Sequence, residues 1–184
     1  MRLTLGDHPP EPSPLVRRFA SRVAIAAGER PILDVACGSG RNAVALGQLG
    51  CKVICVDIDL GSLRASRRAW RAGSLRGVSS RLRLHEMDLM KDPWPFRANA
   101  IGGILNIHFL LPALLPHFVN CLVPGGYLLL ETVPGCGGNY LELPKSGELR
   151  SAIEQVLEPT FYQERKVGPD GYDAVTVRLV ARKP

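Results

Sequence analysis

A glycine-rich turn is the first feature of this sequence that could do chemistry. In the stretch DVACGSGRNAVAL, residues 34–46, the residues Gly38, Gly40 and Ala43 fit the pattern G-x-G-x-x-G/A between a strand-like and a helix-like segment. Backbone N–H groups at such a helix start bind an anion. Two anions fit this pattern, the pyrophosphate of a dinucleotide and the carboxylate of an amino-acid-like ligand.

Three aspartates distinguish these two ligands. Asp34 lies four residues before Gly38, where a carboxylate would repel a pyrophosphate and suits a cation; Asp57 and Asp88 end the next two predicted strands. The carboxyl ends of parallel strands share one edge of a sheet, where ligands bind. S-adenosylmethionine fits this edge. Its carboxylate would bind the turn, and its ammonium group would bind Asp34. Its ribose would contact Asp57, and its adenine would contact Asp88 and the backbone of Leu89. The sequence therefore predicts S-adenosylmethionine, not NAD.

Length, charge and cysteines limit the class of protein. The 184 residues suit one domain, and the most apolar window, residues 100–116, is interrupted by Asn106, His108 and two prolines, unlike a membrane span. The N-terminus lacks the apolar core of a signal peptide. Five cysteines without a CxxC pair indicate free thiols, without a disulfide framework or a zinc site. We therefore expect a soluble, cytoplasmic protein without a membrane partner.

A net charge of +6 is concentrated in one segment. Seven arginines and no acidic residue fall within residues 60–84, and Arg64, Arg67, Arg68 and Arg71 share one face of a predicted helix. A solvated outer face is the favoured interpretation. A nucleic-acid partner is the alternative.

The elements that must position these residues alternate between strands and helices. Predicted strands cover residues 31–37, 52–59, 81–88, 100–110, 124–133, 160–167 and 172–183, and predicted helices cover 14–27, 41–50, 62–72, 113–122 and 147–157. Nearly continuous apolar strands between helices predict an α/β fold with a mostly parallel sheet and helices on both faces. The Pro-Asp-Gly turn at 169–171 predicts a C-terminal antiparallel hairpin.

Four motifs, in this order and spacing, resemble the class I S-adenosylmethionine-dependent methyltransferases: ILDVACGSGRN, VICVDID, LHEMDL and LVPGGYLLLET. The resemblance covers roughly residues 31–131. The triplet Gly40-Arg41-Asn42 and the tail from residue 147 look like the tellurite-resistance (TehB-like) branch. The resemblance implies a Rossmann-like methyltransferase fold with seven strands in the order 3-2-1-4-5-7-6. We expect one domain over residues 1–184, with an N-terminal loop at 1–13, a cofactor-binding core at 31–133, and a lid loop, helix and hairpin at 134–184.

Motif positions and strand ends together give the predicted site. The cofactor-binding residues are predicted to be Asp34, Ala36, Gly38, Gly40, Arg41, Asn42, Asp57, Ile58, Asp88, Leu89 and Asn106. Arg41 has two interpretations, pairing with the ligand carboxylate or a surface position. Family members usually carry an acid at the fourth strand, and residues 99–104 here carry none.

His108 is the predicted catalytic residue, as a general base, because imidazole titrates near neutral pH. The alternative is a structural histidine that bonds to backbone at the strand end. Glu131 either faces the substrate or is an exposed acid, and Asn139 and Tyr140 are candidates for a lid. The sequence shows no metal cluster and no catalytic triad, so methyl transfer is expected to depend on in-line positioning.

A small-molecule acceptor, such as a thiol or chalcogen, is the first functional hypothesis. A nucleic-acid methyltransferase that uses the arginine-rich face is the second. The third is a protein that binds S-adenosylmethionine without catalysis.

Overall fold

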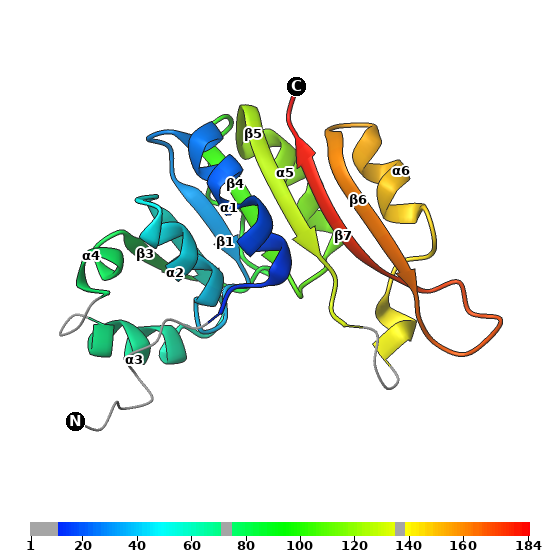
Figure 1. Ribbon diagram of the computed structural model, residues 1–184, viewed down its shortest axis with the longest axis horizontal. Coiled ribbons are helices and arrows are strands. Elements are labelled where there is room, and N and C mark those ends of the chain that lie inside the picture. Colours follow the sequence, from blue (N-terminus) through cyan, green and yellow to red (C-terminus); the bar gives the residue numbers. More distant parts are fainter. Residues whose placement is uncertain (1–10, 71–74, 135–138) are drawn as a thin grey trace.

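The computed structural model describes residues 11–70, 75–134 and 139–184. Within this part of the chain a seven-stranded sheet lies between two layers of helices (Figure 1). The strands are β1 (Ile32–Val35), β2 (Val53–Asp57), β3 (Leu82–Glu86), β4 (Ile101–Ile107), β5 (Leu122–Glu131), β6 (Glu158–Lys166) and β7 (Val175–Arg182). The helices are α1 (Pro14–Ala27), α2 (Arg41–Gln48), α3 (Gly61–Trp70), α4 (Arg76–Ser79), α5 (Leu115–Cys121) and α6 (Glu148–Glu154), with short 3-10 turns at Pro112–Leu114 and Asn139–Glu142.

The strand order is β3-β2-β1-β4-β5-β7-β6, which confirms the predicted fold and topology. All pairs are parallel except those of β7, which runs antiparallel to both β5 and β6. Every residue of the central strands β1 and β4 is buried, as expected for strands that are covered on both faces. The carboxyl ends of β1, β2, β4 and β5 therefore meet at one edge.

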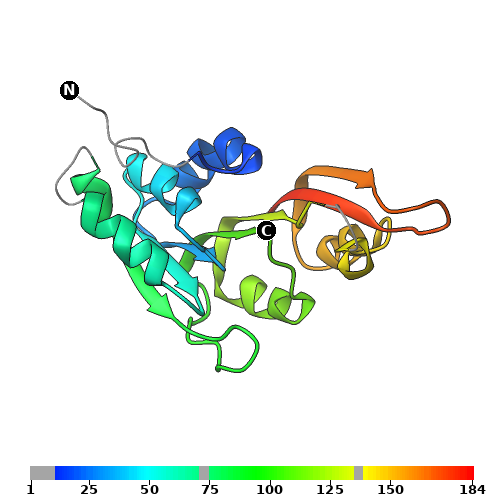
Figure 2. The same ribbon diagram turned by 90° about the horizontal axis from the view of Figure 1, so that it is seen from below.

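Helices cover the two faces of the sheet unequally. Residues of α1 to α4 pack in one core cluster with Ile32, Leu105 and Leu129, and residues of α5 and α6 pack in the other with Leu33 and Leu128. Figure 2 shows α1 and α2 on one side of the sheet and α5 and α6 on the other. On the α1 side, α1 reaches β6 at Phe161, which contacts Phe19 and Arg18.

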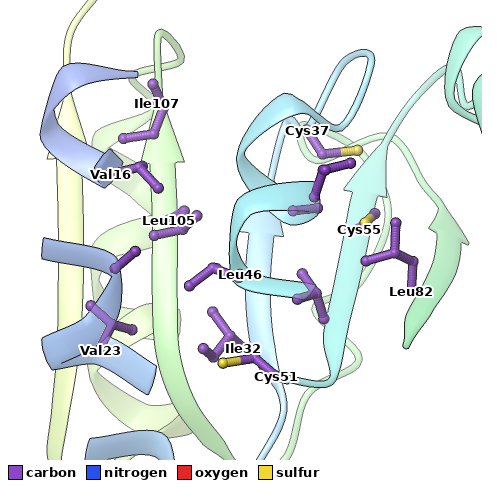
Figure 3. Packing of buried hydrophobic residues seen from close by; sticks show 14 of the residues in the cluster. Val16, Val23, Ile32, Cys37, Leu46, Cys51, Cys55, Leu82, Leu105 and Ile107 are labelled. Carbon is purple, nitrogen blue, oxygen red and sulfur yellow. The ribbon is translucent and has the colours of Figure 1, made fainter. Parts of the chain in front are cut away.

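Two glycines in β4 explain how α1 approaches the sheet. A Cβ atom on Gly102 would lie 2.7 Å from the Cα of Ala27, and one on Gly103 would lie 2.6 Å from Cγ1 of Val23. Because both helix residues already contact the strand, only glycine fits here. Figure 3 shows Val16 and Val23 of α1 beside Leu105 of β4.

Some predicted boundaries were wrong. The predicted strand 81–88 ends at Glu86, because the next residues form a turn around Asp88. The predicted helix 113–122 begins as a 3-10 turn and ends at Cys121, since Leu122 already pairs with Ile101. The sequence analysis did not predict the one-turn helix α4. The last two residues of the predicted helix 62–72 lie outside the described residues.

Candidate active site

The glycine turn lies between β1 and α2 and contains three residues with positive φ. These are Ala36 (54°), Gly38 (53°) and Gly40 (81°). A Cβ on Gly40 would lie 2.6 Å from Cδ1 of Leu63, so glycine is needed there both for its φ and for packing against α3. A Cβ on Gly38 would meet no atom within 4 Å. The side of the turn at Gly38 is therefore open to a ligand.

Asp34 lies beneath this turn and is only 1% exposed. Its Oδ2 accepts a hydrogen bond from the backbone N–H of Ala43, 3.1 Å away, which holds the first turn of α2 against β1. Burial raises the pKa of the Asp34 carboxyl from 3.8 to about 7, although the Ala43 N–H and the charge of Arg41 act in the opposite direction. Asp34 is thus a buried acid that titrates near neutral pH.

Asp57 lies at the carboxyl end of β2 and contacts the turn directly. Its Oδ2 accepts from the N–H of Gly38 at 2.8 Å, and its Oδ1 accepts from the N–H of Asp59 at 3.1 Å. The next residue, Ile58, is 64% exposed, which is unusual for a large apolar side chain that serves only packing. Asp57 and Ile58 therefore form an open, half-polar surface beside the glycine turn.

Asp88 and Leu89 follow β3 in a tight turn. Asp88 Oδ1 accepts from the N–H of Met90 at 2.9 Å, and Oδ2 lies 3.1 Å from Nζ of Lys91. These contacts lower the pKa of Asp88, mainly through the Met90 N–H. The carboxylate is thus ionised and held by its own turn.

The two predicted asparagines differ in their surroundings. Asn42, in α2, accepts a hydrogen bond at Oδ1 from the backbone N–H of Ser13, 2.9 Å away, so its side chain faces the start of α1. Asn106, in β4, is 2% exposed, and its Nδ2 has no hydrogen-bond partner in the described part of the chain. Buried donors of this kind are rare unless a ligand or water completes them. Asn106 is the better candidate for a ligand contact.

His108 follows β4 and connects the glycine turn to β5. Its Nδ1 lies 3.2 Å from Nη2 of Arg41, the first residue of α2. Its Nε2 lies 4.0 Å from Oε1 of Glu131, at the end of β5. Since an arginine can only donate, Nδ1 accepts and the proton of a neutral ring lies on Nε2. Burial lowers the pKa of His108, which keeps the ring neutral at pH 7.

The backbone of His108 also supports the structural alternative. Its φ is 62°, and its N–H donates to the carbonyl of Glu131 at 2.7 Å. This bond fixes the histidine at the strand end. The ring nonetheless lies between two charged side chains, which a structural role does not require.

Glu131 is buried, with 5% exposure, so the interpretation as an exposed acid was wrong. Its Oε1 accepts from Nε of Arg178 at 2.8 Å, because Arg178 of β7 lies directly opposite in the antiparallel register. Its Oε2 has no hydrogen-bond partner among the described residues. The sequence analysis did not predict Arg178 as a site residue. The only signal for it in the sequence was its place in the alternation of side chains along β7.

A cavity of about 530 Å³ adjoins this end of β5. Its lining comes from the ends of β5, β6 and β7, and includes Glu131, Gln163, Arg165, Lys166, Thr176 and Arg178. The contacts from Arg41 through His108 to Glu131 link the glycine turn to this cavity. Two candidate regions, one at the turn and one in the cavity, thus lie on either side of His108. The candidate lid residues Asn139 and Tyr140 border residues 135–138, which lie outside the described residues.

Strand order, glycine turn and acidic strand ends together define a Rossmann-like methyltransferase fold. Residues 32–126, just over half of the chain, match the family profile described as a methyltransferase domain. The chain belongs to this family, and it is a methyltransferase.

Solved structures of the same fold are similar over nearly the whole chain. The [4+2]-cyclase SpnF is 18% identical with a TM-score of 0.67, over 91% of this chain and 80% of that chain. The geranyl diphosphate C-methyltransferase from Streptomyces coelicolor A3(2), solved with Mg²⁺, geranyl diphosphate and S-adenosyl-L-homocysteine, is 16% identical with a TM-score of 0.65, over 91% and 79%. The 1,6-didemethyltoxoflavin-N1-methyltransferase from Burkholderia thailandensis is 16% identical with a TM-score of 0.59, over 92% and 78%. None of the curated protein sequences matches the chain.

Two further observations concern the rest of the described chain. None of its helices is long and apolar enough to cross a bilayer. No group of three or more histidine, cysteine or acidic side chains within it could hold a metal ion.

Proposed function

We propose that this methyltransferase transfers a methyl group from S-adenosylmethionine to a small-molecule acceptor. S-adenosylmethionine is the methyl donor, and it supplies an electrophilic methyl group on a positively charged sulfur. One observation carries the choice of acceptor: the cavity of about 530 Å³ beside Glu131, which has the size of a small-molecule site.

The residues at the glycine turn fit the cofactor. The open side of Gly38 offers room where a side chain would stand, and the turn presents N–H groups to a carboxylate. Asp57 offers acceptor oxygens to ribose hydroxyls, and the unpartnered Nδ2 of Asn106 offers a buried donor. Asp34 acts on a bound ammonium through its charge, since its carboxylate is buried under the turn.

Positions in the turns after β2 and β3 complete the proposed cofactor site. The exposed Ile58 and the partly buried Leu89 would cover the adenine, and Asp88 would lie near its amino group. Ala36 contributes through its positive φ, which lets the chain leave β1 into the turn. Asn42 supports the site indirectly, because its side chain bonds to Ser13.

His108 assists the reaction by position. With Nδ1 bonded to Arg41, the neutral ring presents its Nε2 proton toward Glu131, so the ring orders the acceptor end of the site. Freeing Nδ1 to accept a proton requires Arg41 to move away. A soft acceptor that is already ionised, such as a thiolate or a chalcogen anion, needs no base and gains mainly from in-line placement.

Several contacts argue against nucleic acid as the acceptor. In the arginine-rich segment, Arg64 pairs with Glu86 at 2.5 Å, and Nε of Arg67 donates to the carbonyl of Ser79 at 2.9 Å. Trp70 is 6% exposed and cannot stack on a base. Arg71 lies outside the described residues. These contacts support the solvated, structural interpretation of the segment.

Likeness to the tellurite-resistance branch stays a prediction. Its triplet Gly40-Arg41-Asn42 has internal partners in this structure, at Leu63, His108 and Ser13. We also propose a reducing, cytoplasmic compartment, because the four described cysteines are free and buried.

Calorimetry and turnover assays test this proposal. We expect binding of S-adenosylhomocysteine and none of NAD, then formation of S-adenosylhomocysteine from S-adenosylmethionine with at least one acceptor from a panel of thiols, phenols, amines, tellurite and selenite. Tight NAD binding with no response to S-adenosylhomocysteine would refute the cofactor. Binding without single turnover on any acceptor would favour the non-catalytic hypothesis. A gel shift with RNA that weakens steeply with salt would favour nucleic acid.

A further inference from the structure

The cavity beside Glu131 lies on the face of β6 and β7 that points away from α6, beyond the contact of α1 with Phe161. Its walls come from the α1-side face of the hairpin, where Gln163 pairs with Arg178 and Arg165 pairs with Thr176 across the β6–β7 register. Figure 2 shows α6 on the opposite side of these strands. Phe161, further along the same face of β6, packs on Phe19 of α1, with ring centroids 5.3 Å apart. The polar and charged residues thus begin where α1 stops covering the hairpin.

Positive charge dominates this cavity. Arg165, Lys166 and Arg178 line it, against one carboxylate, Glu131, which already pairs with Arg178. Among the described residues, no acidic side chain lies within ion-pair distance of Arg165 or Lys166. A concave surface with two unneutralised cations attracts and concentrates anions.

Glu131 adds an independent observation at the inner end. Only 5% of Glu131 is exposed, and its Oε2 has no hydrogen-bond partner within the described chain. An ionised carboxylate only accepts hydrogen bonds, and leaving a buried oxygen unpaired costs about 1–3 kcal/mol. A ligand with an O–H, N–H or S–H group would donate the missing hydrogen bond to this oxygen. The inner end of the cavity, at Glu131, therefore suits a hydrogen-bond donor. The outer end, at Arg165 and Lys166, suits an anion.

We propose that the methyl acceptor is a small organic anion held in this cavity. Its carboxylate or phosphate group binds Arg165, with Lys166 adding positive charge at the end of β6, and its hydroxyl, amine or thiol group points toward Glu131 and His108. When the methyl group leaves the sulfonium for this group, the group loses its proton to Oε2 of Glu131. This assignment rests on the proposed small-molecule function and names the class of acceptor. Binding of the remote anion would orient the reactive group next to His108, where the cavity meets the cofactor turn.

Ligand-observed NMR on the full chain tests the charge selectivity without knowledge of the natural acceptor. The probes are 3-hydroxybenzoate, 3-hydroxyphenyl phosphate and the neutral 3-hydroxybenzamide, each titrated with and without saturating S-adenosylhomocysteine. We expect at least one of the two anions to bind at least tenfold more tightly than the amide. The tighter anion tells whether the site prefers a carboxylate or a phosphate.

Two double variants separate the cavity from general charge. Replacement of both cations, Arg165→Ala with Lys166→Ala, should lower the affinity for the anion at least tenfold and leave that for the amide unchanged. Arg68→Ala with Arg76→Ala removes the same charge from exposed positions on α3 and α4, and should change neither. All four side chains are exposed, so both variants should fold, which S-adenosylhomocysteine calorimetry verifies.

The outcomes distinguish this proposal from the proposed function. Equal binding of anions and amide, or equal losses in the two double variants, would overturn the anionic acceptor even if S-adenosylhomocysteine binds normally. Failure to bind S-adenosylhomocysteine would instead overturn the proposed function, and the titrations without it would still report on the cavity.

Discussion

Substitution of Asp34 by asparagine should make the stability of the protein less sensitive to pH. The folded protein holds the Asp34 proton with a pKa of about 7, whereas the carboxyl titrates near its ordinary value of 3.8 when the chain is unfolded. Burial is the main cause, and the neighbouring charge of Asp57 adds to it. The folded state therefore binds this proton more tightly than the unfolded state.

The sign and size of the effect follow from this difference. A raised pKa in the folded state gives a contribution to the free energy of unfolding that is fully present below about pH 4 and is lost as the pH rises to about 7. At 1.36 kcal/mol per pKa unit the full loss is about 4 kcal/mol, of which about 1.5 kcal/mol has already occurred at pH 5. Asparagine cannot ionise, so Asp34→Asn should escape the remaining loss of about 2.5 kcal/mol between pH 5 and pH 8.

Urea denaturation of wild type and Asp34→Asn at pH 5, 6.5 and 8 measures this double difference. The constant cost of placing an amide in the pocket cancels, because it is the same at each pH. Asp170→Asn, in the exposed turn between β6 and β7, is the matched control and should follow the wild type. Parallel pH profiles of wild type and Asp34→Asn would refute the argument that burial of this acid raises its pKa.

The same acid predicts a pH-dependent affinity. A bound ammonium group near Asp34 would favour the ionised carboxylate, so S-adenosylhomocysteine should bind the wild type about tenfold more tightly at pH 8 than at pH 6 and release a proton near pH 7. Calorimetry in two buffers with different ionisation enthalpies measures this release. Asp34→Asn should bind with an affinity that is the same at both pH values.

Three further variants test single contacts. Asp57→Ala should weaken S-adenosylhomocysteine binding about a hundredfold, from two hydrogen bonds to a charged group at about 1.5 kcal/mol each, and an affinity within threefold of the wild type in calorimetry would contradict this role. His108→Ala should leave that affinity nearly intact and lower turnover at saturating cofactor about tenfold or less on a thiol-like acceptor; a thousandfold loss would instead mean that the acceptor is deprotonated on the enzyme. Gly102→Ala should lower the free energy of unfolding by about 2–3 kcal/mol, because the added Cβ would contact the backbone of Ala27. The control Gly77→Ala, whose added Cβ has no atom within 4 Å, should not destabilise the protein. Equal stability of the two variants in urea would contradict the tight contact of α1 with β4.

Much of the fold could be predicted from the sequence because the strands are buried on both faces. Their apolar runs, such as ILDV and VICVD, stand out from the amphipathic helices between them, and the short turn at 169–171 allows only an antiparallel hairpin. Boundaries that depend on single side chains were less predictable. Asp88 ends its strand early because its carboxylate closes a turn onto Met90, and nothing in the alternation of the strand requires this.

The candidate site was predictable to the extent that it follows strand ends. The sequence predicted that Asp34, Asp57 and His108 lie at one edge, and the structure brings Asp57 within 2.8 Å of the glycine turn. Which neighbour each side chain would contact was not predictable. The pair of Glu131 and Arg178 depends on the register of two strands 47 residues apart, and the burial of Glu131 depends on that pair. The cavity next to it lies on the face of β6 and β7 that points away from α6, beyond the contact of α1 with Phe161, and no local pattern encodes this arrangement.

The bond between Ser13 and Asn42 has a practical consequence for how the protein is handled. Because the backbone N–H of Ser13 is held at 2.9 Å by the second residue of α2, the chain enters the fold directly beside the glycine turn. An affinity tag or fusion partner joined ahead of Ser13 would therefore enter the fold beside the glycine turn, whereas one joined behind β7 would leave from the opposite edge of the sheet (Figure 1). Binding and turnover measurements should use a C-terminal tag, and a difference between the two tagged forms would itself report on access to the glycine turn.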